Sequence, residues 1–385
     1  MLRALVLVCC VPGCGSIFDL EHVTLPTGDG GAGNGDVNGD AADGGLPCFG
    51  GDNGGFVRVC FEPDPNDLWL PVASIDTDTM CEKMQPQANG RELCIISAAS
   101  IVISAAITVR GSRPLVLVGT STLTLNAALG VNSTRANGGR TGPGANASPC
   151  VVTNEIDGDD YGPGGGGGAG GTHGGPGGSG GNGALLPSSG GSSQAVAPLV
   201  ALRGGCPGGD GGNAVADSGG DGGGAIYLIA GTELSLDAAV INASGMAGRA
   251  GEAAKQGGGG GGAGGMIVLD APSITLNDTI LIAHGVGGGG GGDATSEGYP
   301  GFEVSFSTYE SPGGPGGFNS GGNGGNGSKL LVPQGAAGLA GGDGSATLVE
   351  GGGGGGGGGH GVIKIFSPNM LAKTGTVVIS PEPQP

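Results

Sequence analysis

Aromatic and charged residues are scarce in this chain. Aromatic side chains make up 3% of the 385 residues, with a single Trp, and charged side chains make up 12%. Large side chains fill ordinary protein cores, so this composition excludes a uniformly packed globular core. Hydrophobic residues still reach 37%, which is too many for a chain that charge keeps unfolded. The apolar residues must therefore be concentrated in a few buried stretches.

Basic residues are also few. Lys and Arg number 14 against 33 Asp and Glu, which gives a formal net charge of −19. Affinity for nucleic acid comes largely from Lys and Arg on phosphates, so we expect no nucleic-acid partner. No segment approaches the length of about 20 apolar residues that a membrane-spanning helix needs. Any attachment to a membrane is therefore expected to use another anchor.

The N-terminus reads "MLRALVLVCCVPGCGS" and is typical of an export signal. Arg3 precedes a short apolar stretch, and Val11-Pro12-Gly13-Cys14 resembles the bacterial lipobox. We expect residues 1–13 to be a signal peptide and Cys14 to be the lipidated residue, which makes the membrane a partner through the lipid. By analogy with such lipoproteins, Gly15 rather than Asp after the cysteine implies export to the outer membrane or cell surface. The alternative is an ordinary secretory signal that is cleaved elsewhere.

The nine cysteines fit this scheme. Cys9 and Cys10 leave with the signal, and Cys14 carries the lipid. An even number of cysteines in an exported chain favours disulfides. The sequence does not choose among the pairings that six cysteines allow, and we favour pairing between chain neighbours. The disulfide candidates are Cys48, Cys60, Cys81, Cys94, Cys150 and Cys206.

Glycine supplies 97 residues and divides the chain into parts. Residues 14–46 are a flexible acidic tether rich in Gly and Asp. Residues 47–134 form an N-terminal β part that contains disulfide candidates, and 135–223 are a glycine-rich insertion. Residues 224–385 return to strands, with further glycine-rich excursions at 246–263 and 286–360.

Two repeats predict the strands. A shift of 22 residues places Leu93 on Leu115 and Ile101 on Leu123, in segments that alternate apolar with small or polar residues. The segments 224–245 and 264–285 align without gaps at a shift of 40, which puts Leu236 on Leu276. A poorer copy begins at Gly361. We therefore expect an all-β fold, a right-handed parallel β-helix interrupted by long glycine-rich insertions.

The insertions have an order of their own, Gly-Gly-X with a period of three, as in "GGPGGSGGN" from Gly174. A polyproline-II-type helix has three residues per turn and makes no internal hydrogen bonds. Two of its edges would be bare backbone here, so neighbouring strands could exchange hydrogen bonds sideways, in a polyglycine-II-like arrangement. The alternative is a set of disordered loops.

The phrases "SRPLVLVG", "ALRGGCPGG", "GGAIYLIAGT", "GGMIVLDAP" and "GGGHGVIKIF" resemble glycine-rich surface lipoproteins of myxobacteria over roughly residues 47 to 380. The resemblance implies export and a β-solenoid, but no assigned activity. A weaker, compositional resemblance is to mycobacterial surface proteins of the PGRS type.

Catalytic patterns are weak. A β-helical polysaccharide lyase or hydrolase needs several outward carboxylates on adjacent turns. Glu233 matches Ser273 and Asp237 matches Asn277, so no acidic ladder forms. The histidines are far apart in sequence, and we interpret them as lone exposed polar residues. The few charges on the predicted strands are Arg110, Arg113, Glu233, Asp237, Asp270, Asp278 and Lys364. The four histidines are His22, His173, His284 and His360.

We expect a non-enzymatic cell-surface lipoprotein with a structural or adhesive role. The alternative is a β-helical protein that binds or degrades polysaccharide. Surface polysaccharide and self-association are the candidate partners beside the membrane. We expect no catalytic or metal site and no cofactor, with at most weak, non-specific calcium binding by scattered carboxylates. Those carboxylates are Asp29, Asp36, Asp40, Asp210, Asp221 and Asp343.

Overall fold

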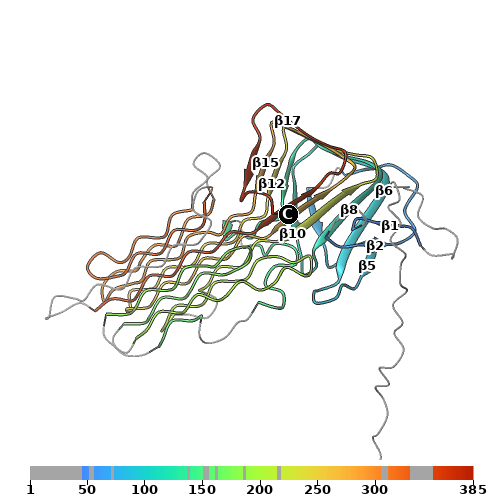
Figure 1. Cartoon of the computed structure of the whole chain (residues 1–385). Helices are drawn as coiled ribbons and strands as arrows, with labels where there is room; N and C mark the ends of the chain where they lie inside the picture. Colours follow the sequence, from blue (N-terminus) through green and yellow to red (C-terminus); the bar gives the residue numbers. More distant parts are fainter. Residues whose placement is uncertain are drawn as a thin grey trace, which may run out of the picture.

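The computed structural model describes residues 46–51, 56–70, 73–136, 139–150, 156–160, 164–184, 188–214, 218–304, 311–329 and 350–384. It has two regions, a body of short strands and a long bundle of extended glycine-rich segments that projects from one side of the body (Figure 1). Among the described residues, none belongs to a helix long and apolar enough to cross a bilayer.

The body contains three sheets. A two-stranded sheet pairs β1 with β2 in antiparallel fashion. A ten-stranded sheet follows the order β16-β13-β10-β8-β11-β14-β17, with β6 on β8 and both β3 and β5 on β6. A six-stranded sheet follows the order β18-β15-β12-β9-β7-β4. The early strands are β1 (Cys48–Phe49), β2 (Val59–Cys60), β3 (Leu68–Trp69), β4 (Ser74–Asp76), β5 (Lys83–Gln85), β6 (Leu93–Ile103), β7 (Ile107–Arg110), β8 (Leu115–Leu125) and β9 (Ala128–Gly130).

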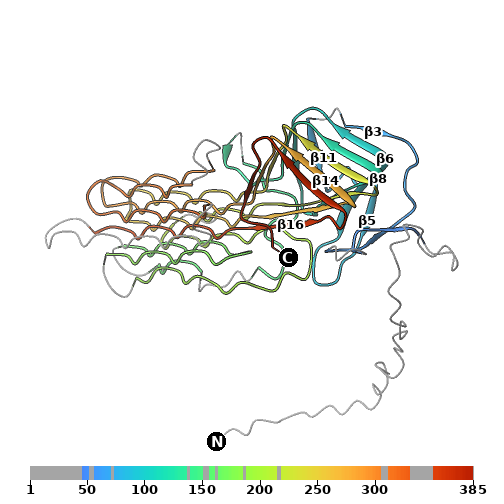
Figure 2. The ribbon, with the colours of Figure 1, turned by 45° about the horizontal axis from the view of Figure 1, so that its top comes forward.

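The later strands return in three similar groups and pair in parallel with earlier ones. The groups are separated in the chain by the glycine-rich segments, yet they lie side by side in the body (Figure 2). They are β10 (Ala225–Ala230), β11 (Glu233–Asp237) and β12 (Val240–Asn242); β13 (Met266–Asp270), β14 (Ser273–Asn277) and β15 (Ile280–Ile282); β16 (Val362–Phe366), β17 (Met370–Thr374) and β18 (Val378–Ser380).

The prediction of a right-handed parallel β-helix, and the β-solenoid that the family resemblance implied, are wrong. The ten-stranded sheet is curled like half a barrel, because the long strand β8 pairs with β10 over its first half and with β11 over its second. We call this sheet the curled sheet. Its pairing is mixed, since β5 runs antiparallel to β6. The sequence repeats predicted where strands lie. They did not indicate that β6 and β8 each continue as one long strand through the bend of the sheet. The described part of the chain is all-β, as expected.

The inner face of the curled sheet packs against the six-stranded sheet. Alternate residues of β11 and β14 point inward, and Leu236 and Leu276 lie directly opposite each other with no exposed surface. Asp237 and Asn277 occupy the opposite face, where Asn277 Nδ2 donates to Asp237 Oδ1 over 2.6 Å. These positions confirm the predicted alternation of the strands in 224–245 and 264–285.

The outer face of the first half of the curled sheet is also covered. All residues of β10 and β13 are buried. Phe49, Val59 and Phe61 from the N-terminal part pack over this face. Strands buried on both faces read as continuous apolar runs, which explains "AIYLIA" and "MIVLD". Asp270 is 4% exposed and accepts a 2.6 Å hydrogen bond from the Tyr227 hydroxyl.

The glycine-rich segments form an ordered array without strands of the ordinary kind. We call the described residues of 156–223, 244–265, 284–329 and 350–361 the glycine array. Its hydrogen bonds recur every third residue: Gly168 N donates to Gly258 O over 3.0 Å, and Gly171 N donates to Gly261 O over 2.9 Å. Gly258 in turn donates to Gly353 O over 2.9 Å. The sideways bonding that the Gly-Gly-X period suggested is therefore present.

Candidate binding surfaces and the junction between the two regions

Three disulfides hold the body and the base of the array. They join Cys48 to Cys60, Cys81 to Cys94 and Cys150 to Cys206. These are the pairs of chain neighbours that we favoured. The first closes the antiparallel pair β1–β2, and the last ties two parts of the first glycine-rich insertion together. Disulfides close loops in the unfolded chain and typically contribute about 2–4 kcal/mol each.

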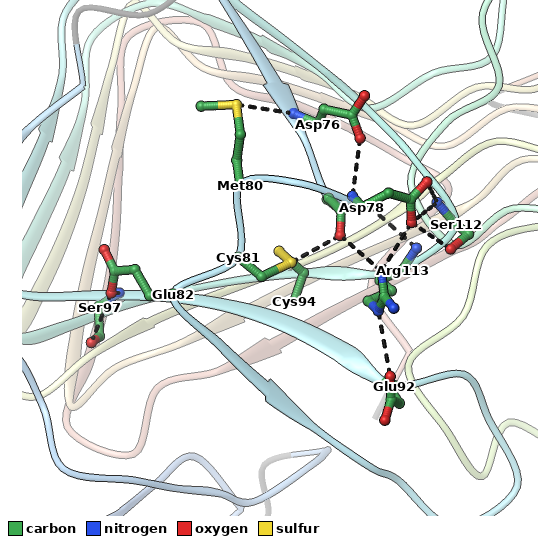
Figure 3. The surroundings of a disulfide bond; sticks show 11 residues. Asp76, Asp78, Met80, Cys81, Glu82, Glu92, Cys94, Ser97, Ser112 and Arg113 are labelled. Atoms are coloured by element: carbon green, nitrogen blue, oxygen red, sulfur yellow. Dashed lines mark hydrogen bonds and ion pairs between the residues drawn. A yellow bond between two sulfur atoms is a disulfide. The ribbon is translucent and has the colours of Figure 1, made fainter.

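A small charged cluster surrounds the Cys81–Cys94 disulfide (Figure 3). Arg113 lies between two carboxylates, with NH1 3.1 Å from Asp78 Oδ1 and Nε 3.5 Å from Glu92 Oε2. Ser112 donates from its backbone N to both carboxylate oxygens of Asp78, over 3.1 Å and 3.0 Å. The charges of this cluster satisfy one another at a corner of the body. The arrangement stabilises the turn.

A hollow of ≈ 710 Å³ lies where the loop after β9 meets the glycine array. Its walls carry both signs of charge in equal number, three arginines and three aspartates. The charged residues are Arg135, Arg140 and Arg249, and Asp157, Asp210 and Asp221. No local sequence motif marks this hollow, because its walls come from five separated segments of the chain.

Arg135 fixes the loop to the array. Its Nε donates to Ala247 O over 2.6 Å, and its NH2 donates to Gly219 O over 2.9 Å. Burial, with the neighbouring charge of Arg249, lowers the pKa of Arg135 to about 10. The side chain is still protonated at neutral pH and is used as a structural cross-link. Burial also lowers the pKa of Arg140, whose Nε has no hydrogen-bond partner among the described residues.

The carboxylates of the hollow are also committed to protein donors. Asp221 accepts from Thr141 Oγ1 over 2.6 Å and from Asn146 Nδ2 over 2.7 Å. Asp210 accepts from Gly219 N over 2.8 Å, and burial raises the pKa of Asp157. The structure thus brings together two of the six proposed calcium ligands, Asp210 and Asp221, but surrounds them with arginines. Within the described part of the chain, no group of three His, Cys, Asp or Glu side chains has the arrangement of a metal site.

Three histidines meet at the plane where the glycine array joins the body. His173 and His284 are buried, with 0% and 1% of their surface exposed, so the interpretation of lone exposed residues is wrong. His360 lies close enough to both to lower their pKa values. Gly174 N donates to His360 O over 2.9 Å. The residues are distant in sequence, and only the pairing of glycine segments brings them together.

Burial is the main cause of the histidine pKa values. It lowers the pKa of His173 to about 3, with a further contribution from the charge of Arg203. It lowers the pKa of His284 to about 4, with a contribution from His360. His173 Nδ1 lies 2.9 Å from Gly264 O, and His284 Nε2 lies 2.5 Å from Ser380 Oγ. All three rings are therefore neutral at pH 7 and form hydrogen bonds within the junction.

Arg203 lies beside the histidines and is 1% exposed. Its NH1 donates to Gly204 O over 3.3 Å and lies 3.8 Å and 4.0 Å from the sulfurs of Cys206 and Cys150. Burial lowers its pKa. Sequence reasoning missed this residue, because a single arginine between glycines gives no signal of burial. Arg203 thus connects the Cys150–Cys206 disulfide to the backbone at the base of the array.

The flanks of the array present the X positions of the Gly-Gly-X segments. Ser179 and Asn182 are exposed, while the glycines that precede them are largely buried. The exposed rows are therefore side chains at three-residue intervals on a backbone lattice, with a rise of about 3.1 Å per residue. Several predicted residues lie outside the described part: Cys14, His22, Asp29, Asp36, Asp40 and Asp343.

Comparison with protein-family models, with curated proteins and with solved structures finds no match for this chain. The functional argument consequently depends on the geometry of the two regions and on the N-terminal sequence pattern. The charged hollow and the flanks of the glycine array face solvent with polar groups in a concave and a regular arrangement, respectively.

Proposed function

We propose that this protein is a non-catalytic, lipid-anchored protein of the cell surface with a structural or adhesive role. The observation that carries the proposal is the glycine array. It projects from the disulfide-bonded body (Figure 1). The exposed X positions place rows of side chains on its flanks. A lattice of backbone hydrogen bonds is rigid and offers a repeating surface, which suits repeated weak contacts with another surface.

Further features support this role. Three disulfides are typical of a chain that folds in an oxidising compartment outside the cytosol. The lipobox-like sequence ending at Cys14 supports acylation, and residues 14–46 supply a flexible acidic tether between the lipid and the body. The net charge of −19 keeps a glycine-rich protein soluble and separates it from other acidic surfaces.

The charged hollow favours a second candidate, a protein that binds or degrades polysaccharide. Its arginines and aspartates would offer donors and acceptors to a polar ligand, and burial raises the pKa of Asp157. A carboxyl group whose pKa is raised suits a general acid. The commitment of Asp210 and Asp221 to protein donors favours the structural role over this one.

The test uses the full chain in its native host. A strain without the protein is complemented with the parent or with Cys14→Ser. The proposal expects incorporation of labelled palmitate only with the parent, protease access on intact cells, and weaker attachment or cell cohesion in the deleted strain. Unchanged attachment and cohesion in the deleted strain would contradict the structural or adhesive role. Release of reducing ends from a polysaccharide by the purified protein would favour the second candidate.

A further inference from the structure

Two neighbouring segments of the array carry large side chains at their X positions. Tyr299 N donates to Pro315 O over 2.8 Å, and Phe302 N donates to Pro312 O over 2.9 Å. The segments 298–303 and 312–318 therefore run antiparallel, side by side, among the orange strands at the upper edge of the array (Figures 1 and 2). The stretch is anchored beneath, because Gly314 N and Gly317 N donate to Gly288 O and Gly291 O, each over 2.9 Å.

A third segment completes a repeated pattern. Asn326 Oδ1 accepts from Gly313 N over 2.9 Å, and Asn323 Oδ1 accepts from Gly316 N over 2.8 Å. Reading across the three segments gives two successive rows of the same composition, each an aromatic ring, a proline and an asparagine. The rows are Phe302–Pro312–Asn326 and Tyr299–Pro315–Asn323. We call these six residues the aromatic face.

The aromatic face is open to solvent. Tyr299 and Phe302 are 49% and 52% exposed, and Phe318 next to the second row is 84% exposed. Within the described part of the chain, these are the large aromatic side chains that are exposed. Aromatics make up only 3% of the sequence, and three of them are exposed close together here, which marks this edge as a candidate interaction site.

The polar groups beside the rings are arranged for hydrogen bonding. A shallow hollow of ≈ 480 Å³ is lined by Tyr299, Pro315, Phe318, Asn323 and Ser320. The Ser320 hydroxyl is buried and has no hydrogen-bond partner among the described residues. Since Oδ1 of each asparagine accepts from the backbone, its amide Nδ2 remains a donor at the exposed end of the row.

We propose that the aromatic face binds a neutral, extended polysaccharide chain, with sugar rings stacked on Phe302 and Tyr299. This inference names the ligand class of the surface proposed above and depends on that proposal. The axial C–H groups of a pyranose ring are weakly positive and suit the negative face of an aromatic ring. The ring hydroxyls then meet the asparagine amides. Pyranose rings are apolar on their faces and polar at their rims, which is the pattern of each row.

The spacing of the rows fits such a chain. Three residues of an extended three-fold helix rise about 9 Å, so the two aromatic rings repeat at about that interval. This interval is comparable to one disaccharide unit of an extended β-1,4-linked glycan. A polymer with a repeating apolar face can therefore contact both rings with the same group of atoms.

Charge favours a neutral glycan over a second copy of this chain or an acidic polymer. No residue of the aromatic face is charged, but the whole chain carries −19. Docking two copies through this face would bring two acidic surfaces together, and an anionic polymer would meet the same repulsion. A neutral polymer meets no such barrier.

The test measures binding of the purified full chain to soluble β-1,4-linked neutral oligosaccharides and to polygalacturonate. The variants are Tyr299→Ala, Phe302→Ala and Phe302→Tyr, with the exposed Leu371→Ala on β17 as a matched control. We expect each alanine variant of the aromatic face to bind the neutral chain about tenfold more weakly. Phe302→Tyr and Leu371→Ala should bind as the parent does, and polygalacturonate should not bind.

Thermal melting confirms that each variant is folded. Absence of binding to any neutral glycan by the parent would overturn the inference, as would an equal loss in Leu371→Ala. Ring-dependent self-association without glycan binding would assign the face to a second copy and overturn it too. Binding in solution does not depend on cellular location, so this result is separable from the palmitate and attachment assays.

Discussion

The curled sheet and the glycine array solve the same problem in opposite ways. Both must offset the conformational entropy of an ordered backbone. The curled sheet does so with side chains: Leu236, Leu276 and their neighbours remove apolar surface from water on its inner face, and β10 and β13 do so on both faces. The array has almost no side chains to bury, and its backbone groups bond to neighbours on several sides instead.

The difference changes what each region tolerates. In the curled sheet a position is defined by the volume that its side chain fills. In the array a position is defined by the lack of a side chain. A Cβ added at Gly260 would lie far inside contact distance of the backbone oxygen of Ala169, and one at Gly168 would overlap Gly209 O. Glycine is therefore required in the array by the close approach of neighbouring backbones, rather than by positive φ angles.

The largest effect is expected from a charge in the curled sheet. Leu276 has no exposed surface and lies opposite Leu236. Leu276→Asp would bury an unpaired carboxylate, at a cost of about 5 kcal/mol or more, and should unfold the body at ordinary temperature. Circular dichroism and thermal melting measure the loss. Leu371→Ala, at an exposed position of the same sheet, is the control, and similar melting of the two variants would show that β14 does not contribute to the core.

The second effect should be confined to the array. Gly260 donates to Gly209 O and accepts from Gly220 N, each over 2.9 Å. Gly260→Ala would push its segment away from the backbone of Ala169 and so strain these hydrogen bonds, and overpacking of this kind costs about 3 kcal/mol. Hydrogen exchange should show faster exchange in the array with β10 and β13 still protected. Gly130→Ala is the control, because the nearest atom to its Cβ is a side-chain oxygen at 3.2 Å. Equal exchange in both variants would contradict the close-packed array.

Much of the strand pattern could be predicted, because side chains record it. The alternation of apolar residues placed Leu236 opposite Leu276 correctly. The same alignment was off by one residue in the preceding strand, where Ile226 pairs with Ile267 instead of Met266. The gap-free shift of 22 failed in the same way, because a register shift occurs between Ala98 and Ser100. Single-residue irregularities at bends leave no mark in a periodic pattern.

The site was much less predictable, since glycine carries no register. Nothing in "GGGGGG" says which other run it will pair with, so the meeting of His173, His284 and His360 could not be foreseen. The aromatic face had a weak signal. Tyr299 and Phe302 interrupt the period of three with large rings where other X positions hold small residues. Their adjacency to Pro312 and Pro315 required the structure.

The third effect concerns the junction between the two regions. The folded-state pKa of His284 is lowered to about 4 from 6.5, so the unfolded chain binds protons first as the pH falls. The contribution of this group to stability is complete above pH 6.5 and is lost on acidification toward pH 4, by about 2 kcal/mol at pH 5. His173, with a pKa near 3, acts in the same direction. The raised pKa of Asp157 opposes them.

His284→Gln keeps a polar atom near Ser380 Oγ but cannot titrate. Denaturant unfolding of this variant should therefore depend less on pH between 6.5 and 5 than unfolding of the parent does. The diagnostic difference between parent and variant is the slope of the unfolding free energy against pH, and not which of the two is more stable at any one pH. Parallel pH profiles would mean that His284 is solvated in the folded protein, and the junction would then not be dry.

The smallest effect is expected from an X position of the array. Ser179 is exposed, and its Oγ accepts one long hydrogen bond of 3.4 Å from Ser193 N. Ser179→Ala removes that bond without adding volume, so stability should change by less than about 0.5 kcal/mol.

Gly180→Ala, one residue along the same segment, would place a Cβ against the backbone oxygen of Gly167 and should loosen the array. Each variant has a methyl side chain, at position 179 or at position 180. The two methyl groups lie on different edges of the extended segment. Hydrogen exchange at Gly167 and Gly191 reads the result directly. If Ser179→Ala lost as much protection from exchange as Gly180→Ala, side chains would hold the array together. Only then would the exposed edge that carries Ser179 matter as much as the glycine edge.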